Sequence, residues 1–192
     1  MSTAEKTPRF PQLTPETLTD AQRPLAEQIM KISRVGIAGP YNALLRSPVM
    51  AQRMYDLLDY LRWHSSVPTR LNEFAILIQG RLWRSQVEWF AHFPLAVKAG
   101  LSEKVALDLK ANKRPEGMQP DEAAVYDFCM ELSTKHAVSD ETFSRLRKFF
   151  SEQQVVDLTV ISGIYVTVAM VLAVSEASVP AGNELPFKPG ES

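Results

Sequence analysis

The sequence contains a single cysteine, Cys129, among 192 residues. One thiol excludes an internal disulfide framework, a CxxC redox pair and any intramolecular dithiol cycle. The neighbouring Tyr126, Phe128 and Met130 are apolar, so we interpret Cys129 as a small buried hydrophobic residue. A chain of this length buries roughly 70% of its unfolded surface, which is enough to form a core without a disulfide or a structural metal.

Neither sign of charge is in excess, because 21 Lys and Arg residues face 22 Asp and Glu residues for a net charge of −1. This balance and the lack of a basic run argue against a nucleic-acid or anionic-membrane partner. The N-terminal residues contain no apolar stretch after a basic region, which is not the pattern of a secretory signal. We therefore expect a cytoplasmic protein.

Long apolar runs are also scarce, and one stretch, Val155 to Val174, is apolar over about the length that spans a bilayer. It contains Asp157 and Ser162, Glu152 and Glu176 flank it, and no positive cluster marks either end. We predict a buried core or interface helix here and no membrane partner. Its apolarity exceeds what a lone eight-helix domain requires, which predicts a homo-oligomer.

Strand-like alternation and internal repeats are both absent, and the periodicity is helical throughout. The expected helices cover residues 20–33, 48–64, 68–84, 85–100, a short stretch capped by Ser102, 121–136, 140–150 and a last helix capped by Ser151 with Gln154. A glycine-containing break lies at residues 36–42. The prediction is an all-α bundle of about eight helices, in a single domain over residues 19–178. The proline-bearing arm (1–18) and tail (179–192) are expected to be either disordered or laid across a neighbouring subunit.

The main candidate site follows the pattern Glu73-x11-Ser85-x2-Glu88-x3-His92. At about 100° per residue, Ser85, Glu88 and His92 point within about 60° of one another, so they line one strip of the helix 85–100. Glu73 lies on the preceding helix among apolar neighbours that would desolvate its carboxyl, a condition that suits proton transfer. If the two helices pack as a hairpin, two carboxyls and an imidazole converge.

Two structural interpretations of the same residues stay open. Ser85-Gln-Val-Glu88 matches a capping box, in which serine and glutamate satisfy each other's backbone donors. Glu88 and His92, one helical turn apart, also match a surface pair, although the adjacent Trp89 and Phe93 favour a semi-buried wall. A lone Glu-x3-His is half a metal site at best, so we predict no metal.

The spacing resembles that of the carboxymuconolactone decarboxylase / alkyl hydroperoxidase D family. The hydroperoxidase branch carries Glu-x11-Cys-x2-Cys-x3-His, and here Ser85 and Glu88 stand where the two cysteines would be. The decarboxylase branch resembles Glu88-Trp-Phe-Ala-His92 followed by a glycine-containing turn, here Ala99-Gly-Leu-Ser102.

Two further stretches are similar to the family: Gly39-Pro-Tyr-Asn42 before a short helix, and Gly163-Ile-Tyr165 in the last helix. The resemblance covers about residues 35–175. It implies an AhpD-like helical fold, assembly into trimers or hexamers, and no cofactor.

The resemblance places Glu73 and His92 on the family's proton-relay positions. Serine can neither form a disulfide nor reduce a peroxide, so thiol peroxidase activity is disfavoured. The leading expectation is a cofactor-free lyase or isomerase that acts on a small carboxylated lactone or aromatic-catabolism intermediate. The alternatives are a peroxide-handling antioxidant protein that lacks the cysteine pair, and a non-catalytic oligomeric ligand-binding protein.

For the lyase we assign His92 as the main proton donor or acceptor, Glu88 as its orienting partner or a second acid, Glu73 as the residue that tunes the imidazole, and Ser85 as a hydrogen-bond donor to the substrate. The substrate is expected to be a carboxylic acid and to meet a cation. Arg81 and Arg84 precede a helix N-terminus that adds partial positive charge. The candidates for the binding pocket are Arg84, Tyr41, Trp89 and Tyr165.

Overall fold

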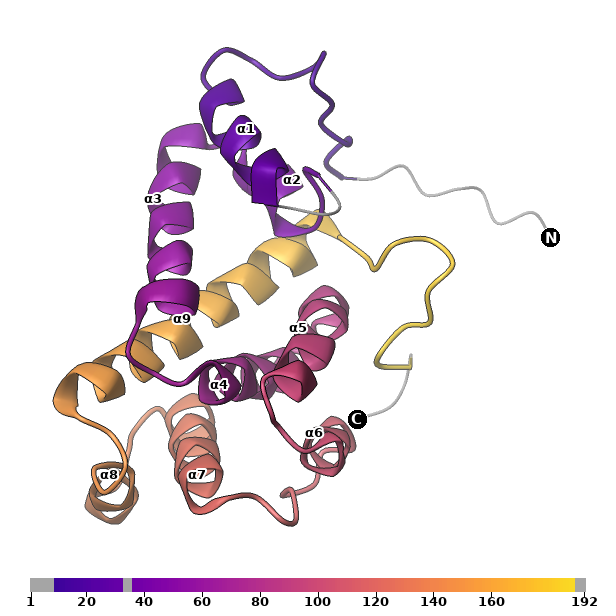
Figure 1. The fold of residues 1–192 in the computed structure, drawn as a ribbon. Coiled ribbons are helices and arrows are strands. Elements are labelled where there is room, and N and C mark those ends of the chain that lie inside the picture. Colours follow the sequence, from indigo (N-terminus) through magenta and orange to yellow (C-terminus); the bar gives the residue numbers. More distant parts are fainter. Residues whose placement is uncertain (1–8, 33–35, 189–192) are drawn as a thin grey trace.

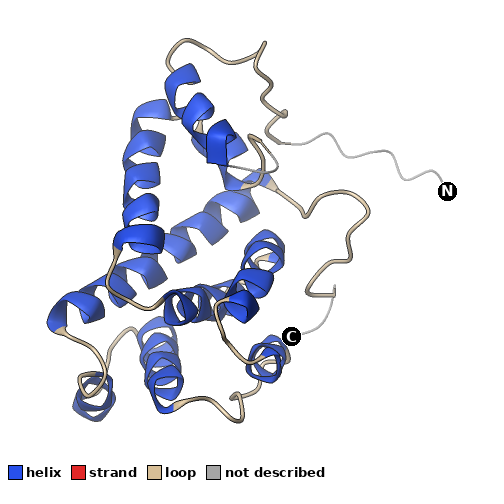
Figure 2. Ribbon diagram, viewed as in Figure 1, coloured by secondary structure: helices blue, strands red, loops and turns tan. Residues whose placement is uncertain are grey.

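The computed structural model describes residues 9–32 and 36–188 of the chain. These residues form nine α-helices and one π-helical turn, and none of them forms a strand (Figures 1 and 2). The predicted all-α class is therefore confirmed.

Helix α4 (Thr69–Leu82) is the centre of the fold. It packs against α5 (Gln86–Lys98), α7 (Pro120–Lys135) and α9 (Glu152–Ser175), which surround it in Figure 1. The five residues 74–78 of α4 are each fully buried. These five side chains are apolar on every side of the helix. Covering the helix all round therefore removes apolar surface from water and buries no polar side chain at these positions.

The remaining helices lie around this centre. Their bounds are α1 (Arg23–Ile32), α2 (Pro40–Leu44), α3 (Pro48–Asp59), α6 (Glu103–Lys110) and α8 (Asp140–Leu146). Helix α2 begins within the expected break at residues 36–42 and runs two residues beyond it. Gly39 there adopts a left-handed backbone with φ 57°, and Pro40 then opens the helix at its first position. A break before Pro40 and a short helix after it are both present.

A π-helical turn, Tyr60–His64, extends α3 where the sequence predicts an uninterrupted α-helix to residue 64. The backbone N–H of Ser65 donates to the carbonyl of Tyr60 over 2.8 Å, which is the wider hydrogen-bond spacing that defines this turn. Asn72 of α4 donates its side-chain amide to the Leu61 carbonyl over 2.8 Å. This hydrogen bond ties the turn to α4. Arg62, which follows Leu61 in the turn, lies beside the candidate site.

The described parts of the two chain ends pack against other segments of the same chain. Arg9 forms an ion pair with Glu176 at 2.9 Å. At the other end Phe187 is buried against Trp89, with ring centroids 5.3 Å apart, and its backbone exchanges two hydrogen bonds with the Gln86 side chain. The tail up to Lys188 lies against α5 of its own chain, held there by a hydrophobic anchor and a paired amide. Residues 1–8 and 189–192 lie outside the described residues.

Helix α9 has two different faces. One face packs against α4 and α2, as predicted for a core helix. The other is exposed and consists of small or apolar residues, which we call the α9 stripe: Val156, Thr159, Gly163, Thr167, Met170 and Val174. By length and composition α9 could cross a membrane, and 44% of its most apolar stretch is buried inside the protein. The predicted capping box between Ser151 and Gln154 is present at its start.

Candidate active site

Helices α4 and α5 form the hairpin that the sequence predicts, with a turn at residues 83–85. Arg84 adopts a left-handed backbone with φ 50° in this turn, and the Ser85 N–H donates to the Gly80 carbonyl over 2.8 Å. The helices approach closely at Gly80, where a Cβ would lie 3.6 Å from the Cβ of Glu88. At about 1.5 Å per residue, positions 73 and 92 lie at similar heights above the turn.

The hairpin brings Glu73 and His92 into direct contact. His92 Nδ1 lies 2.6 Å from Glu73 Oε2, and both side chains are buried. Arg62 Nη2 approaches the other oxygen of Glu73 at 3.6 Å. A carboxylate only accepts hydrogen bonds, so this contact favours the tautomer with the proton on Nδ1, in which Nε2 has the free lone pair. Tyr165 of α9 packs edge-on against the imidazole, with ring centroids 5.0 Å apart.

Glu88 is the second carboxyl of the site, and it has a different environment. The side chain is only 3% exposed, and neither of its oxygens has a hydrogen-bond partner among the described residues. Burial raises the pKa of Glu88 to about 8, against a partly opposing effect of the nearby Ser85 hydroxyl. A carboxyl with this pKa is mostly protonated at neutral pH, and neither of its oxygens is paired with a described residue.

Both structural interpretations of the motif are wrong. Ser85 is the N-cap residue of α5, but its side chain makes no capping hydrogen bond, and its hydroxyl is buried without a partner among the residues described. The Glu88–His92 surface pair is not formed either, because both side chains are buried and His92 bonds to Glu73 instead. The polar side chains of this strip of α5 therefore face the interior of the protein, and the Ser85 hydroxyl does not cap the start of the helix.

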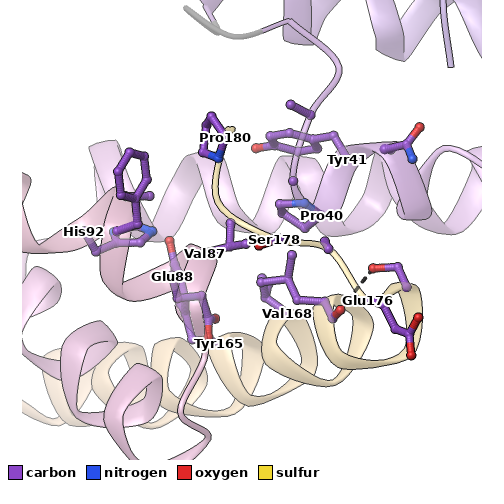
Figure 3. A pocket seen from close by; sticks show the side chains of 18 of the residues that line it. Pro40, Tyr41, Val87, Glu88, His92, Tyr165, Val168, Glu176, Ser178 and Pro180 are labelled. Atoms are coloured by element: carbon purple, nitrogen blue, oxygen red, sulfur yellow. Dashed lines mark hydrogen bonds between the residues drawn. The ribbon is translucent and has the colours of Figure 1, made fainter. Parts of the chain in front are cut away.

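A cavity of about 740 Å³ lies next to these groups. Its walls come from α2, the π-helical turn, α5, α9 and segments from both chain ends, and the lining residues that matter below are Tyr41, Arg62, Glu88, His92, Tyr165 and Val168. Figure 3 shows Glu88 and His92 close to Tyr165, while the segment that follows α9 passes beside Tyr41 with Ser178 and Pro180. A cavity of this size suits a small organic molecule.

Glu73 and Ser85 do not line the cavity. Glu73 holds the imidazole in place from α4, and Ser85 lies next to Glu88. The carboxyl and the imidazole that line the cavity are consequently those of Glu88 and His92. Glu73, rather than Glu88, is the residue that orients the imidazole.

The four predicted binding residues separate into two pairs. Tyr41 and Tyr165 line the cavity, and burial raises the pKa of both phenols. Trp89 and Arg84 do not line it. Trp89 packs against Phe93 and Phe187, and Arg84 donates to the Lys188 carbonyl over 2.9 Å.

The cation beside the cavity is Arg62, which sequence reasoning did not single out. Arg81 donates instead to the Lys110 carbonyl over 3.0 Å and does not line the cavity. No local pattern marks Arg62, since Tyr-Leu-Arg-Trp-His is an ordinary amphipathic stretch. Its position depends on the π-helical turn and on the packing of that turn against α4.

The remaining candidates for site chemistry lie elsewhere or are absent from the described residues. Cys129 of α7 is fully buried beside Ser162, burial raises its pKa to about 12, and it does not line the cavity. Over residues 9–32 and 36–188, no group of three or more His, Cys, Asp or Glu side chains is placed to hold a metal ion.

Solved structures of other proteins share this arrangement of helices. An uncharacterized peroxidase-related protein from Ralstonia eutropha JMP134, described as an alkylhydroperoxidase AhpD core, superposes with a TM-score of 0.77 at 15% identity, over 93% of this chain and 95% of that one. The fold is AhpD-like. An uncharacterized peroxidase-related protein from Silicibacter sp. TM1040 gives a TM-score of 0.73 at 13% identity, over 94% and 96% of the two chains.

A third structure, a protein of unknown function from Agrobacterium tumefaciens, covers 71% of this chain and 94% of its own, with a TM-score of 0.64 at 19% identity. No family model and no curated protein matches the sequence. Identities this low establish the AhpD-like fold, and they leave the chemistry to be argued from the residues of this chain.

Proposed function

We propose that this protein is a cofactor-free proton-transfer enzyme, a lyase or isomerase resembling the carboxymuconolactone decarboxylases. Its substrate would be a small carboxylated lactone or a related aromatic-catabolism intermediate. The main support is Glu88, a buried, neutral carboxyl without a partner among the described residues, on the same cavity wall as an imidazole held by a carboxylate. An acid and a base in one sheltered cavity are what such a reaction needs from a protein.

The two groups have complementary roles in this proposal. Glu88 has a pKa of about 8, so it carries a proton near neutral pH and releases it without a large energetic cost. His92, with Nδ1 bonded to Glu73, presents Nε2 as the proton acceptor. For an isomerisation, His92 removes a proton from one carbon of the substrate and Glu88 delivers a proton to another.

A decarboxylation uses the same acid. The bond between the substrate carbon and its carboxylate breaks, the electron pair moves into the conjugated carbonyl of the substrate, and CO₂ leaves. Glu88 then donates its proton to that carbon, and the resulting carboxylate regains a proton from water. The apolar walls around Val168 and Leu172 disfavour the charged starting state and so assist loss of CO₂.

A thiol peroxidase cycle within this chain has little support. Such a cycle needs an accessible thiolate next to the proton relay. Cys129 is fully buried on α7 with its pKa raised to about 12, and Ser85 and Glu88 stand where the two cysteines of the hydroperoxidase pattern would be. The chemistry available at the cavity is proton transfer.

The proposal is tested by incubating the protein in D₂O with muconolactone and other small lactone acids that carry a single carboxylate. Nuclear magnetic resonance would follow both CO₂ loss and deuterium entry at carbon. We expect His92→Gln and Glu88→Gln each to lower the rate by about 10²- to 10⁴-fold. The exposed Glu27 of α1 offers a matched control, and Glu27→Gln should keep the wild-type rate. Equal rates in all four proteins would show that the site has no catalytic role.

A further inference from the structure

The cavity has an unbalanced set of hydrogen-bonding groups on the side of the π-helical turn. The Nε of Arg62 is buried and has no hydrogen-bond partner among the described residues. The guanidinium makes a long contact of 3.6 Å with Glu73 and lies over the ring of Trp63 at 4.7 Å. Neither contact uses Nε, and a buried N–H without an acceptor costs about 1–3 kcal/mol. The site is therefore short of one acceptor.

Arg62 is also the only lysine or arginine among the described residues that line the cavity. It lies at the reactive end, since Glu73 joins it to His92 through contacts of 3.6 and 2.6 Å. Most of the remaining lining is apolar or aromatic, including Leu58, Val168 and Leu172. A molecule that complements this cavity has one anionic end and an apolar body.

We propose that the cavity binds a small monoanionic carboxylate, with the carboxylate group accepting hydrogen bonds from Arg62 and the apolar body lying along α9. This inference rests on the proposed function, because it orients the substrate of that site. A guanidinium presents N–H groups in a planar fork that matches the two oxygens of a carboxylate. The carboxylate supplies the acceptor that Nε lacks.

The surrounding charges favour a single negative charge over a phosphate dianion. The Glu73 carboxylate already lies 3.6 Å from the guanidinium, whereas Glu176, which also lines the cavity, is paired with Arg9 at 2.9 Å. A second negative charge on a ligand held at Arg62 would meet the Glu73 carboxylate in an apolar setting, with one guanidinium to offset both. A carboxylate anchored at Arg62 also places the adjoining carbons next to Glu88 and His92, where the proton transfers occur.

Calorimetric titration with phenylacetate and its neutral isostere phenylacetamide tests the inference at equilibrium, without turnover. We expect the wild type to bind phenylacetate about tenfold or more tightly than phenylacetamide, because a charge-assisted hydrogen bond contributes more than a neutral one. Arg62→Gln should weaken phenylacetate binding at least about tenfold and leave phenylacetamide binding within about twofold. Arg53→Gln, which changes an exposed arginine of α3, the helix that the π-helical turn extends, should change neither affinity.

Equal affinity of the wild type for the acid and the amide, or binding of neither, overturns the inference. So does an Arg62→Gln variant that binds phenylacetate as the wild type does. Should that variant not fold, Arg62→Lys keeps the charge without the fork, and its weaker preference for the acid is the expected result. Carboxylate binding without any proton transfer would refute the proposed function alone, whereas proton transfer without this preference would refute the anchor alone.

Discussion

Glu88→Gln keeps the size and shape of a buried side chain while removing its ionisation, so it isolates what that ionisation does to folding. In the folded protein burial raises the pKa of Glu88 to about 8 from a usual 4.5. Between these two values the folded state holds the proton and the unfolded state has released it. The folded state binds more protons there, so the free energy of unfolding of the wild type falls as the pH rises.

The size of the effect follows from the two pKa values. At about 1.4 kcal/mol for each pH unit, a rise from 4.5 to about 8 corresponds to about 5 kcal/mol. A cavity of about 740 Å³ beside the carboxyl has room for water, which solvates the ionised form in part. We therefore expect the stability of Glu88→Gln relative to the wild type to grow as the pH rises from about 5 to about 9. Over that range the gain in the free energy of unfolding should reach about 2 to 5 kcal/mol.

Urea unfolding of both proteins at a series of pH values measures this difference. The two stability curves should lie close together at about pH 5 and separate progressively as the pH rises to about 8. Glu27→Gln, which changes an exposed carboxyl, should follow the wild-type curve throughout. If Glu88→Gln follows it too, Glu88 is ionised in the folded protein at neutral pH, and the argument that it serves as an acid fails.

Two further predictions concern features away from the site. Cys129 should react with a thiol reagent only after denaturation, because burial raises the pKa of this thiol to about 12. For the same reason Cys129→Ala should not change any hydroperoxide consumption. Rapid labelling of the native protein would contradict both expectations. We also propose that the α9 stripe joins copies of the chain, so light scattering after size exclusion should give a mass above the 21.5 kDa of the monomer. Gly163→Arg should reduce that mass, since a Cβ at Gly163 meets nothing within 4 Å inside one chain, and a monomeric wild type would end this proposal.

Much of the helical architecture could be predicted from local signals. Hydrophobic periodicity located all eight expected helices, although α3 and α8 end several residues earlier than expected, and the capping box of Ser151 and Gln154 marked the start of α9 correctly. The end of α3 could not be predicted, because the π-helical turn depends on the contact between Asn72 and the Leu61 carbonyl. Helix α2 shows how a glycine and a proline both interrupt the chain and begin a new helix.

The site was only partly predictable for a similar reason. The spacing of Ser85, Glu88 and His92 put them on one strip of α5, as helix geometry requires. Spacing alone could not decide which carboxylate would hold the imidazole. A carboxyl one turn away on the same helix and one on the neighbouring helix are both plausible partners, and the packing of α4 chose Glu73.

The sequence by itself determined the helical class of the protein, the candidate residues for proton transfer, and the lack of a dithiol. These properties follow from composition and from periodicities within single helices. Only the tertiary structure decided that the Glu88 carboxyl is buried without a partner among the described residues, that Arg62 and not Arg84 lines the cavity, and that the tail lies on α5. Each of these depends on burial and on contacts between distant segments, which set the dielectric surroundings and hydrogen-bond partners of a side chain.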